Sequence, residues 1–195
     1  MSYWASDMQA ANDLFADFIT EISSTMKGQL ISTELEGGRL AEIFDLYAGI
    51  DAVHVWRGNV RGVAVRVQWG VNYKTFTIRY KRHTGAPTEY AKRLAAIRGN
   101  DGALYPYLTI QAYADKRDQG RLLSYAIVKT ADLYEYIDGR LHDNGTTISG
   151  IRWRKCPEGN TFLYVSFDEL IEAGVHCVVR DFVTNSLHIR RREAA

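Results

Sequence analysis

The sequence has little of what crosslinked, zinc-structured or membrane-spanning proteins need. Its two cysteines, Cys156 and Cys177, lie far apart from each other and from any run of histidines, which argues against a disulfide framework and a zinc site of ordinary spacing. No apolar run approaches the roughly 18 residues that span a bilayer. The amino terminus has neither the basic nor the apolar region of a signal peptide. We therefore expect a cytoplasmic protein without a membrane partner.

Other absences narrow the chemistry and the domain count. The sequence has no glycine-rich phosphate loop of the dinucleotide or P-loop kind and no GxSxG nucleophile motif. It has three prolines, no low-complexity linker and no internal repeat. With 195 residues, 46% of them hydrophobic, the chain is long enough to bury one core. We expect a single domain over residues 1–195.

Charge is balanced overall but unevenly placed along the chain. The formal net charge is +1, yet acidic residues gather between Asp7 and Asp51, and basic residues gather between Lys74 and Arg98. A positive surface suits a phosphate backbone, and an acidic cluster suits a divalent cation. The alternative is that both are solvated faces, as most charge runs are.

The segment from Phe44 to Arg82 organises the predicted fold. Apolar and polar residues alternate after Asp51, the chain turns at Gly58-Asn59, and alternation continues through 63–69 and 75–82. This pattern predicts three antiparallel strands in a meander. Further extended runs are expected at 29–33, 107–113, 122–129, 146–153, 161–165 and 175–180.

Helices are expected on both sides of this meander. Asp7 is the predicted cap of an N-terminal helix, residues 34–46 contain a short acidic helix, and further helices begin at Thr88, Thr130 and Ser166. The sequence thus predicts an α+β fold in which helices flank a mixed central sheet. Its core covers about 40–130, hairpin, helix and strand decoration covers 140–182, and a basic tail covers 183–195.

This order of elements resembles the core of the PD-(D/E)XK nuclease-like superfamily between about Leu40 and Thr130. The resemblance rests on Gly49-Ile50-Asp51 at the start of the first strand, on Arg66-Val67-Gln68 in the next, and on a third strand that leads into a basic helix. It implies a nuclease that cleaves phosphodiester bonds with Mg, or Mn, as cofactor. Members of this superfamily often act as dimers.

The resemblance also implies a set of metal ligands. Asp51 matches the acid that opens one strand, and Glu42 or Asp45 matches the acid that the preceding helix often contributes. Glu42 and Asp45 are three residues apart, so they share one face of a helix. Gln111, in the segment TIQAY, lies where a later core strand would bring a polar group to the edge of the site.

The acid and lysine pair of the superfamily departs from its pattern here. In one alignment Arg66 takes the place of the acid and Gln68 that of the lysine. In the other, Gln68 takes the acid position and Gly70 the lysine position. Gln68 can then ligate a metal through its carbonyl oxygen, and Lys74 or Lys81 is the candidate for a displaced catalytic cation.

The strand period places several polar side chains on one face. Ala64, Arg66 and Gln68 alternate with apolar residues, so they share a face. In a sheet covered by helices such buried polar groups need partners, which indicates either a functional site or an internal ion-pair network. The candidate nucleic-acid-binding residues are Arg66, Arg79, Lys81, Arg82, Lys92 and Arg93.

Three hypotheses follow from these observations. The first is a metal-dependent nuclease in which Asp51, Gln68 and Lys74 act on the phosphodiester. The second is a degenerate relative, of a phage or mobile-element type, that binds nucleic acid or blocks a nucleic-acid-processing or defence complex without cleaving. The third is an unrelated α+β binding or toxin-like domain. The expected partner is nucleic acid, with DNA ahead of RNA, or a protein complex.

Overall fold

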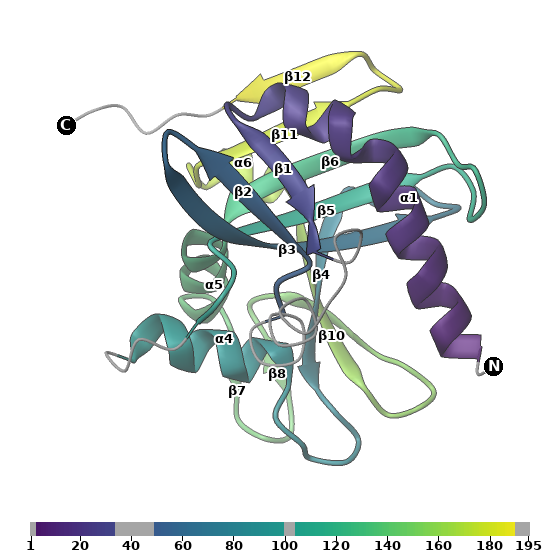
Figure 1. Ribbon diagram of the computed structural model, residues 1–195. Helices are drawn as coiled ribbons and strands as arrows, with labels where there is room; N and C mark the ends of the chain where they lie inside the picture. Colours follow the sequence, from purple (N-terminus) through teal and green to yellow (C-terminus); the bar gives the residue numbers. More distant parts are fainter. Residues whose placement is uncertain (1–2, 34–48, 100–103, 190–195) are drawn as a thin grey trace.

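The protein is built from two main β-sheets, and a long helix crosses the outer face of the larger one (Figure 1). The structure is a computed structural model that describes residues 3–33, 49–99 and 104–189. The larger sheet has the strand order β1-β2-β3-β5-β6-β11-β12, and β3 and β5 are its one parallel pair among the described strands. The α+β class and the mixed central sheet are confirmed. Its strands are β1 (Gln29–Ser32), β2 (Ala52–Trp56), β3 (Asn59–Trp69), β5 (Leu108–Ala114), β6 (Leu122–Lys129), β11 (Cys177–Asp181) and β12 (Ser186–Ile189).

The predicted hairpin at Gly58-Asn59 is confirmed, and the predicted strand at 75–82 forms, but its predicted place as the third strand of the meander is wrong. β2 and β3 pair antiparallel, with Trp56 opposite Asn59. Gly58 has a φ of 75°, which glycine adopts without steric cost. The third strand, β4 (Thr75–Lys81), leaves this sheet and pairs with β10 (Thr161–Ser166). Alternation predicts a strand but not its partner, which lies here roughly 80 residues along the chain.

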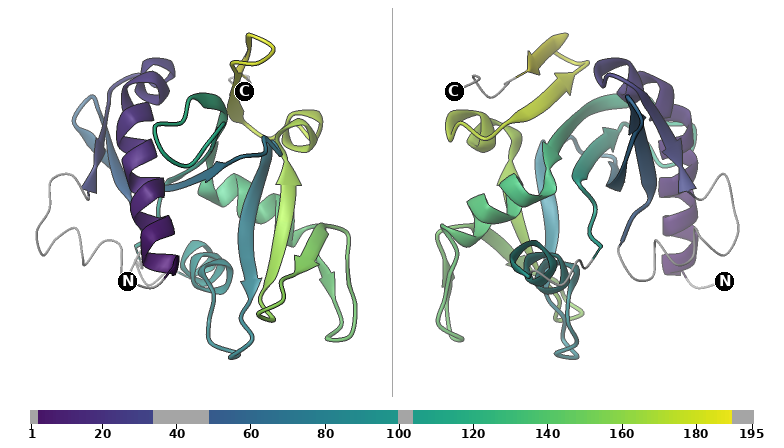
Figure 2. Two further views of the ribbon diagram at one scale, coloured as in Figure 1. Left: turned by 90° about the vertical axis from the view of Figure 1, so that its right-hand side faces the viewer. Right: turned by 60° about the vertical axis from the view of Figure 1, so that its left-hand side comes forward.

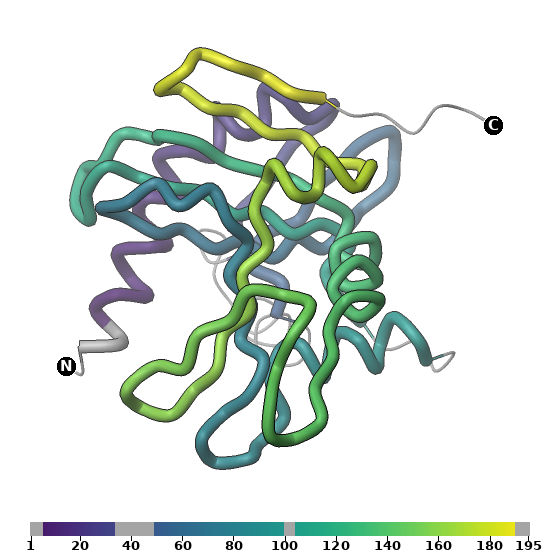
Figure 3. The backbone as a smooth tube through the Cα atoms, turned by 180° about the vertical axis from the view of Figure 1, so that it is seen from behind, coloured from purple at the N-terminus to yellow at the C-terminus, as the bar shows by residue number. Residues whose placement is uncertain are grey.

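The smaller sheet has the order β4-β10-β9, where β9 is Arg152–Lys155. β4 and β10 stand side by side and apart from α1 (Figure 2). The loops that follow β4 and β9 project at one end of the molecule, beside the hairpin of β7 (His142–Asp143) and β8 (Ile148–Ser149) (Figure 3). His83 N donates to Asn160 Oδ1 at 3.3 Å, which joins the first two loops.

α1 (Tyr3–Thr25) packs its apolar stripe on one face of the larger sheet. Leu14, Phe15, Phe18 and Ile22 fall at helical spacing and are buried against the sheet. Each such burial contributes about 2 kcal/mol. Asp7 is inside the helix and not its cap, because α1 begins earlier in the chain.

A second core fills the space between the other face of the larger sheet and the smaller sheet. Phe76 and Leu163, from β4 and β10, pack there with residues of the helices α4 (Glu89–Arg98), α5 (Thr130–Asp138) and α6 (Phe167–Glu172). A row of small and apolar residues on β6 faces the same core. The smaller sheet is therefore held by the same core as the helices.

The helices predicted to begin near Thr88, Thr130 and Ser166 all form on this side. Thr88 caps α4, since its Oγ1 accepts from Ala91 N at 3.4 Å. Ser166 forms the predicted capping box with Glu169. Thr130 is the first residue of α5 and not its cap, and its hydroxyl bonds instead with that of Thr109 at 2.9 Å.

The C-terminal part of the chain completes both sheets. β10 and β11 lie in the segment predicted as decoration, and β12 lies in the segment predicted as a basic tail. The predicted strands at 107–113 and 122–129 are confirmed as β5 and β6 in the middle of the larger sheet. The predicted helix at 34–46 falls outside the described residues. Within the described residues, no helix has both the length and the apolar character to cross a membrane.

Candidate nucleic-acid interface

Polar side chains of β3 and β5 meet β4 between the two sheets. The Arg66 guanidinium donates to Thr77 O at 3.0 Å, and Thr77 N donates to Gln111 Oε1 at 3.4 Å. Gln111 Nε2 in turn donates to Gln68 Oε1 at 3.4 Å. Arg66 lies opposite Gln111 in the parallel pairing of β3 with β5, which brings these side chains to one face. The predicted gathering of Arg66, Gln68 and Gln111 is confirmed, and each has an internal partner.

Glu89, at the start of α4, faces several arginines. Its Oε1 lies 2.5 Å from Arg93 Nη2, and its Oε2 lies 3.8 Å from Arg66 Nη2. Burial alone would raise the pKa of Glu89, but Arg93, Arg66, Arg79 and Arg82 outweigh it and lower that pKa. Among the described residues, the half-exposed Glu89 carboxylate thus stands among four guanidinium groups, and positive charge exceeds negative charge around it.

Two of these arginines have different environments. Arg93 is buried, donates to Gly49 O at 3.1 Å and pairs with Glu89 one turn back on α4. Arg79 is half-buried and, in the described part of the chain, its Nε has no hydrogen-bond partner, as is also true of Arg93 Nε. Burial, followed by the nearby Arg66 and Arg82, lowers the pKa of Arg79. Arg79 is therefore a cation that an added anion would stabilise.

The smaller sheet presents aromatic and basic side chains together on the face that Arg79 shares. Phe162 lies opposite Arg79 on β4 and opposite Arg154 on β9, and Arg79 Cζ is 5.6 Å from the Phe162 ring centroid. Tyr164, two residues along β10, has Arg154 and Arg66 near enough to oppose the effect of burial, which raises its pKa. We call Arg66, Arg79, Arg154, Phe162 and Tyr164 the arginine–aromatic face.

Sequence reasoning missed the β9 and β10 part of this face. The alternation of Phe162 and Tyr164 with buried Leu163 and Val165 was a usable signal. What it lacked was the pairing of β10 with β4, since that pairing alone places these rings beside Arg79.

Asp51 lies toward α1, away from the arginine–aromatic face. Its Oδ2 accepts from Val65 N at 2.6 Å. Asp51 directly precedes β2, so this bond satisfies an amide of β3 that lies beyond the first residue of β2. Asp51 also lines a cavity of about 30 Å³ with Phe15 of α1 and with Val65 and Val67, the β3 residues that face α1. Arg66 and Gln68 face β4, on the opposite side of the sheet.

The other predicted site residues are spread over the molecule. Lys74 pairs with Asp181 of β11, and Lys81 Nζ lies 2.6 Å from Asp143 Oδ2. Arg82 and Lys92 are exposed. Glu42 and Asp45 fall outside the described residues, and the described residues hold no group of three His, Cys, Asp or Glu side chains placed for a metal. Asp51 alone does not make the predicted Mg or Mn site, so that site stays a prediction and we derive no chemical step through it.

Comparison with known proteins adds no relative to this description. No family model, no curated protein and no solved structure matches the chain. The fold, which is mixed α+β with two main sheets, and the site are therefore the basis for the function.

Proposed function

We propose that the protein binds nucleic acid through the arginine–aromatic face, as a binding protein that does not depend on hydrolysis. The observation that carries the proposal is the excess of positive charge beside half-buried rings. Among the described residues, Arg66, Arg79 and Arg93 lie around the Glu89 carboxylate, with Asp51 as a second carboxylate in range of Arg93, and Phe162 lies against Arg79. A phosphate backbone supplies the missing negative charge, and arginine is well suited to bind it because its donors form a planar fork.

The unpaired Nε donor of Arg79 supports a phosphate oxygen at this position. Its Nε is buried and lacks an acceptor in the described part of the chain. A buried donor without a partner costs about 1–3 kcal/mol, and a ligand oxygen would remove that cost. The 3.8 Å separation between Arg66 and Glu89 is long for a charge-assisted hydrogen bond, so Arg66 can also turn toward a phosphate.

Metal-dependent hydrolysis is the second candidate, and one observation favours it. Asp51 interacts electrostatically with Arg93, the same guanidinium that pairs with Glu89. Two carboxylates thus act on one arginine near the start of α4. Glu42 and Asp45 would have to complete a metal site there.

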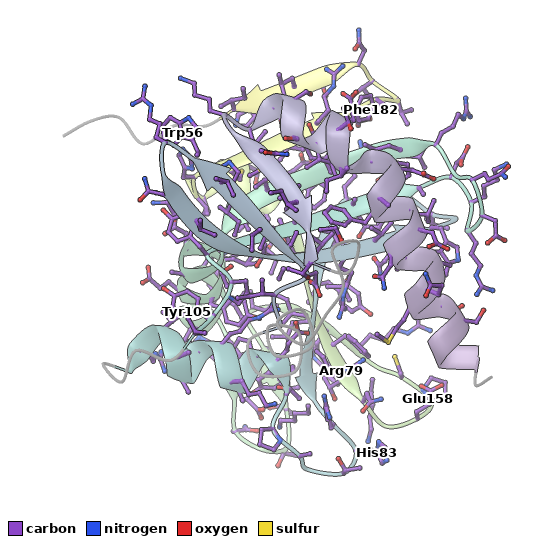
Figure 4. The ribbon with its side chains drawn as sticks, viewed as in Figure 1. Trp56, Arg79, His83, Tyr105, Glu158 and Phe182 are labelled. Carbon is purple, nitrogen blue, oxygen red and sulfur yellow. The ribbon has the colours of Figure 1, made fainter. Side chains whose placement is uncertain are left out.

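The binding test uses fluorescence anisotropy of labelled DNA and RNA oligonucleotides across a series of salt concentrations. Arg79→Gln should weaken binding about tenfold, since a hydrogen bond to a charged group is worth about 1.5–3 kcal/mol, and should make log Kd less dependent on log salt. Arg57→Gln is the matched control. Arg57 stacks on Trp56, and Trp56 lies in the upper part of the view in Figure 4 whereas Arg79 lies in the lower part.

The outcomes separate the candidates. Absence of binding to any oligonucleotide at low salt, or equal weakening by Arg57→Gln, would overturn the proposal. Cleavage with Mg or Mn that is absent with chelator and in Asp51→Asn would instead favour the nuclease.

A further inference from the structure

The two rings on β10 are spaced for separate stacking partners. Phe162 and Tyr164 alternate with buried Leu163, so they lie on the same face of the sheet. Two residues along a strand span roughly 6.7 Å. This is about twice the 3.4 Å that separates bases along one strand of a stacked double helix. Two successive bases can therefore lie on these two rings only when the strand is stretched and its bases are unpaired.

Each ring has cationic side chains on the neighbouring strands. Phe162 is flanked by Arg79 and Arg154. Tyr164 lies opposite Arg152 on β9 and has Arg66 within electrostatic range. Strands are about 4.8 Å apart, so a guanidinium next to each ring lies where the phosphate of a stacked nucleotide would pass.

Partial exposure of the rings suits this use. Both side chains are half-buried, so the sheet holds part of each while the rest stays accessible to solvent. Tyr73, with 67% of its surface exposed, lies close enough to Tyr164 to affect its pKa.

We infer that the preferred ligand of the arginine–aromatic face is unpaired, single-stranded nucleic acid, whose bases stack on Phe162 and Tyr164 and whose phosphates contact Arg79 and Arg154. This inference rests on the proposed binding function and adds the class of strand. Stacking on aromatic side chains tolerates any base, because every base has a π-face. Base pairs in a duplex are stacked on each other and do not offer that face.

The test compares affinities for labelled 12-nucleotide dT and rU strands and for a duplex hairpin of matched length. The single strands should bind about tenfold or more tightly than the duplex. Phe162→Leu and Tyr164→Leu should each weaken binding to single strands by roughly five- to 150-fold, the value of one stacked base. The conservative variants Phe162→Tyr and Tyr164→Phe keep a ring and should bind like the wild type. The dT and rU arms tell DNA from RNA.

The matched control is Trp56→Leu, which removes a ring that also lies beside an arginine, with Arg57 Cζ 4.8 Å from its centroid, but in the upper part of the view in Figure 4 rather than the lower part, where Arg79 lies. It should leave binding unchanged. If the duplex binds as tightly as the single strands and both leucine variants bind like the wild type, the inference is overturned while nucleic-acid binding stands. If no oligonucleotide binds, the proposed function and this inference fail together. A thermal melt of each variant shows whether it is folded, and the ring-retaining variants keep the comparison decisive if a leucine variant unfolds.

Discussion

Arg93 and Lys92 show how neighbouring cations of one helix can have different roles. Both lie on α4, yet Lys92 is exposed whereas Arg93 is buried and bonded to Gly49 O and Glu89. Buried guanidinium groups need several acceptors, and the Nη atoms of Arg93 find them within the protein, whereas its Nε has no partner among the described residues. Of these two predicted nucleic-acid contacts, only Lys92 is free to meet a ligand from solution.

The sequence predicts which face of β3 its polar side chains occupy, but not which groups they bond. The strand period puts Arg66 and Gln68 on one face, and their need for acceptors follows from burial. The partners themselves, the acceptor Thr77 O and the Gln111 amide that donates to Gln68 Oε1, come from strands whose packing no local pattern specifies. Asp51 is the reverse case, because its match to a strand-opening acid was apparent but its bond to Val65 N was not.

Asp143 should make stability depend on acid pH. Hydrogen bonds from Lys81, then Tyr80 and Gly145 N, hold the pKa of Asp143 at about 2, below its ordinary 3.8. Because the folded-state pKa is the lower one, the ionised carboxylate stabilises the fold above about pH 4, and this contribution is lost as the pH falls toward about 2. The free energy of unfolding should therefore differ most between wild type and Asp143→Asn above about pH 5, and less as the pH falls.

Urea unfolding followed by tryptophan fluorescence at several pH values measures this difference. Asp118→Asn, at an exposed loop position, is the control and should follow the wild-type profile. A difference between Asp143→Asn and wild type that stays constant with pH would contradict the assigned role.

At the scale of elements, helix starts were predicted better than strand partners. Thr88 and Ser166 are caps because a short side chain accepts a bond from an amide three residues on, which is a local property of the sequence. The pairing of β4 with β10 is not local, and the alternating pattern of β4 is equally compatible with β3 as its neighbour. This is why β4 was wrongly predicted as the third strand of the meander. It is also why the β9 and β10 part of the arginine–aromatic face was missed.

The Ser166 capping box should contribute measurably to stability. Ser166 Oγ accepts from Glu169 N at 3.1 Å, and Glu169 Oε2 accepts from Ser166 N at 3.1 Å. Ser166→Ala should lower the free energy of unfolding by about 1 kcal/mol. Ser166→Thr retains the hydroxyl and should lower it by only about a few tenths of a kcal/mol. Urea denaturation at neutral pH distinguishes the two. Equal losses would mean that the cap is not the cause.

At the scale of the whole molecule, a few side chains join the two sheets. The Tyr113 hydroxyl, on β5, donates to Thr75 O at 2.7 Å and accepts from Thr75 N at 3.2 Å. Lys74 pairs with Asp181 of β11, whose side chain is 6% exposed. These bonds fix the start of β4 against the larger sheet and thereby set the position of Arg79.

Lys74 should therefore matter for stability more than for chemistry. Lys74→Met leaves the buried Asp181 carboxylate without its cation and should lower the free energy of unfolding by about 1–3 kcal/mol. Lys92→Met, at an exposed position, should change it by less than about 0.5 kcal/mol. A double-mutant cycle with Asp181→Asn measures the coupling of the pair. A coupling energy near zero would return Lys74 to the candidates for a catalytic cation.

The pairing of β4 with β10 also bears on the order in which a growing chain can fold. Lys81 pairs with Thr161, so β4 leaves the ribosome roughly 80 residues before its partner strand. At about 5–20 residues per second, β4 waits about 4–16 seconds before the strand that pairs with it is synthesised. We expect the β2–β3 hairpin to form early and the arginine–aromatic face to be completed only after β10 has been synthesised.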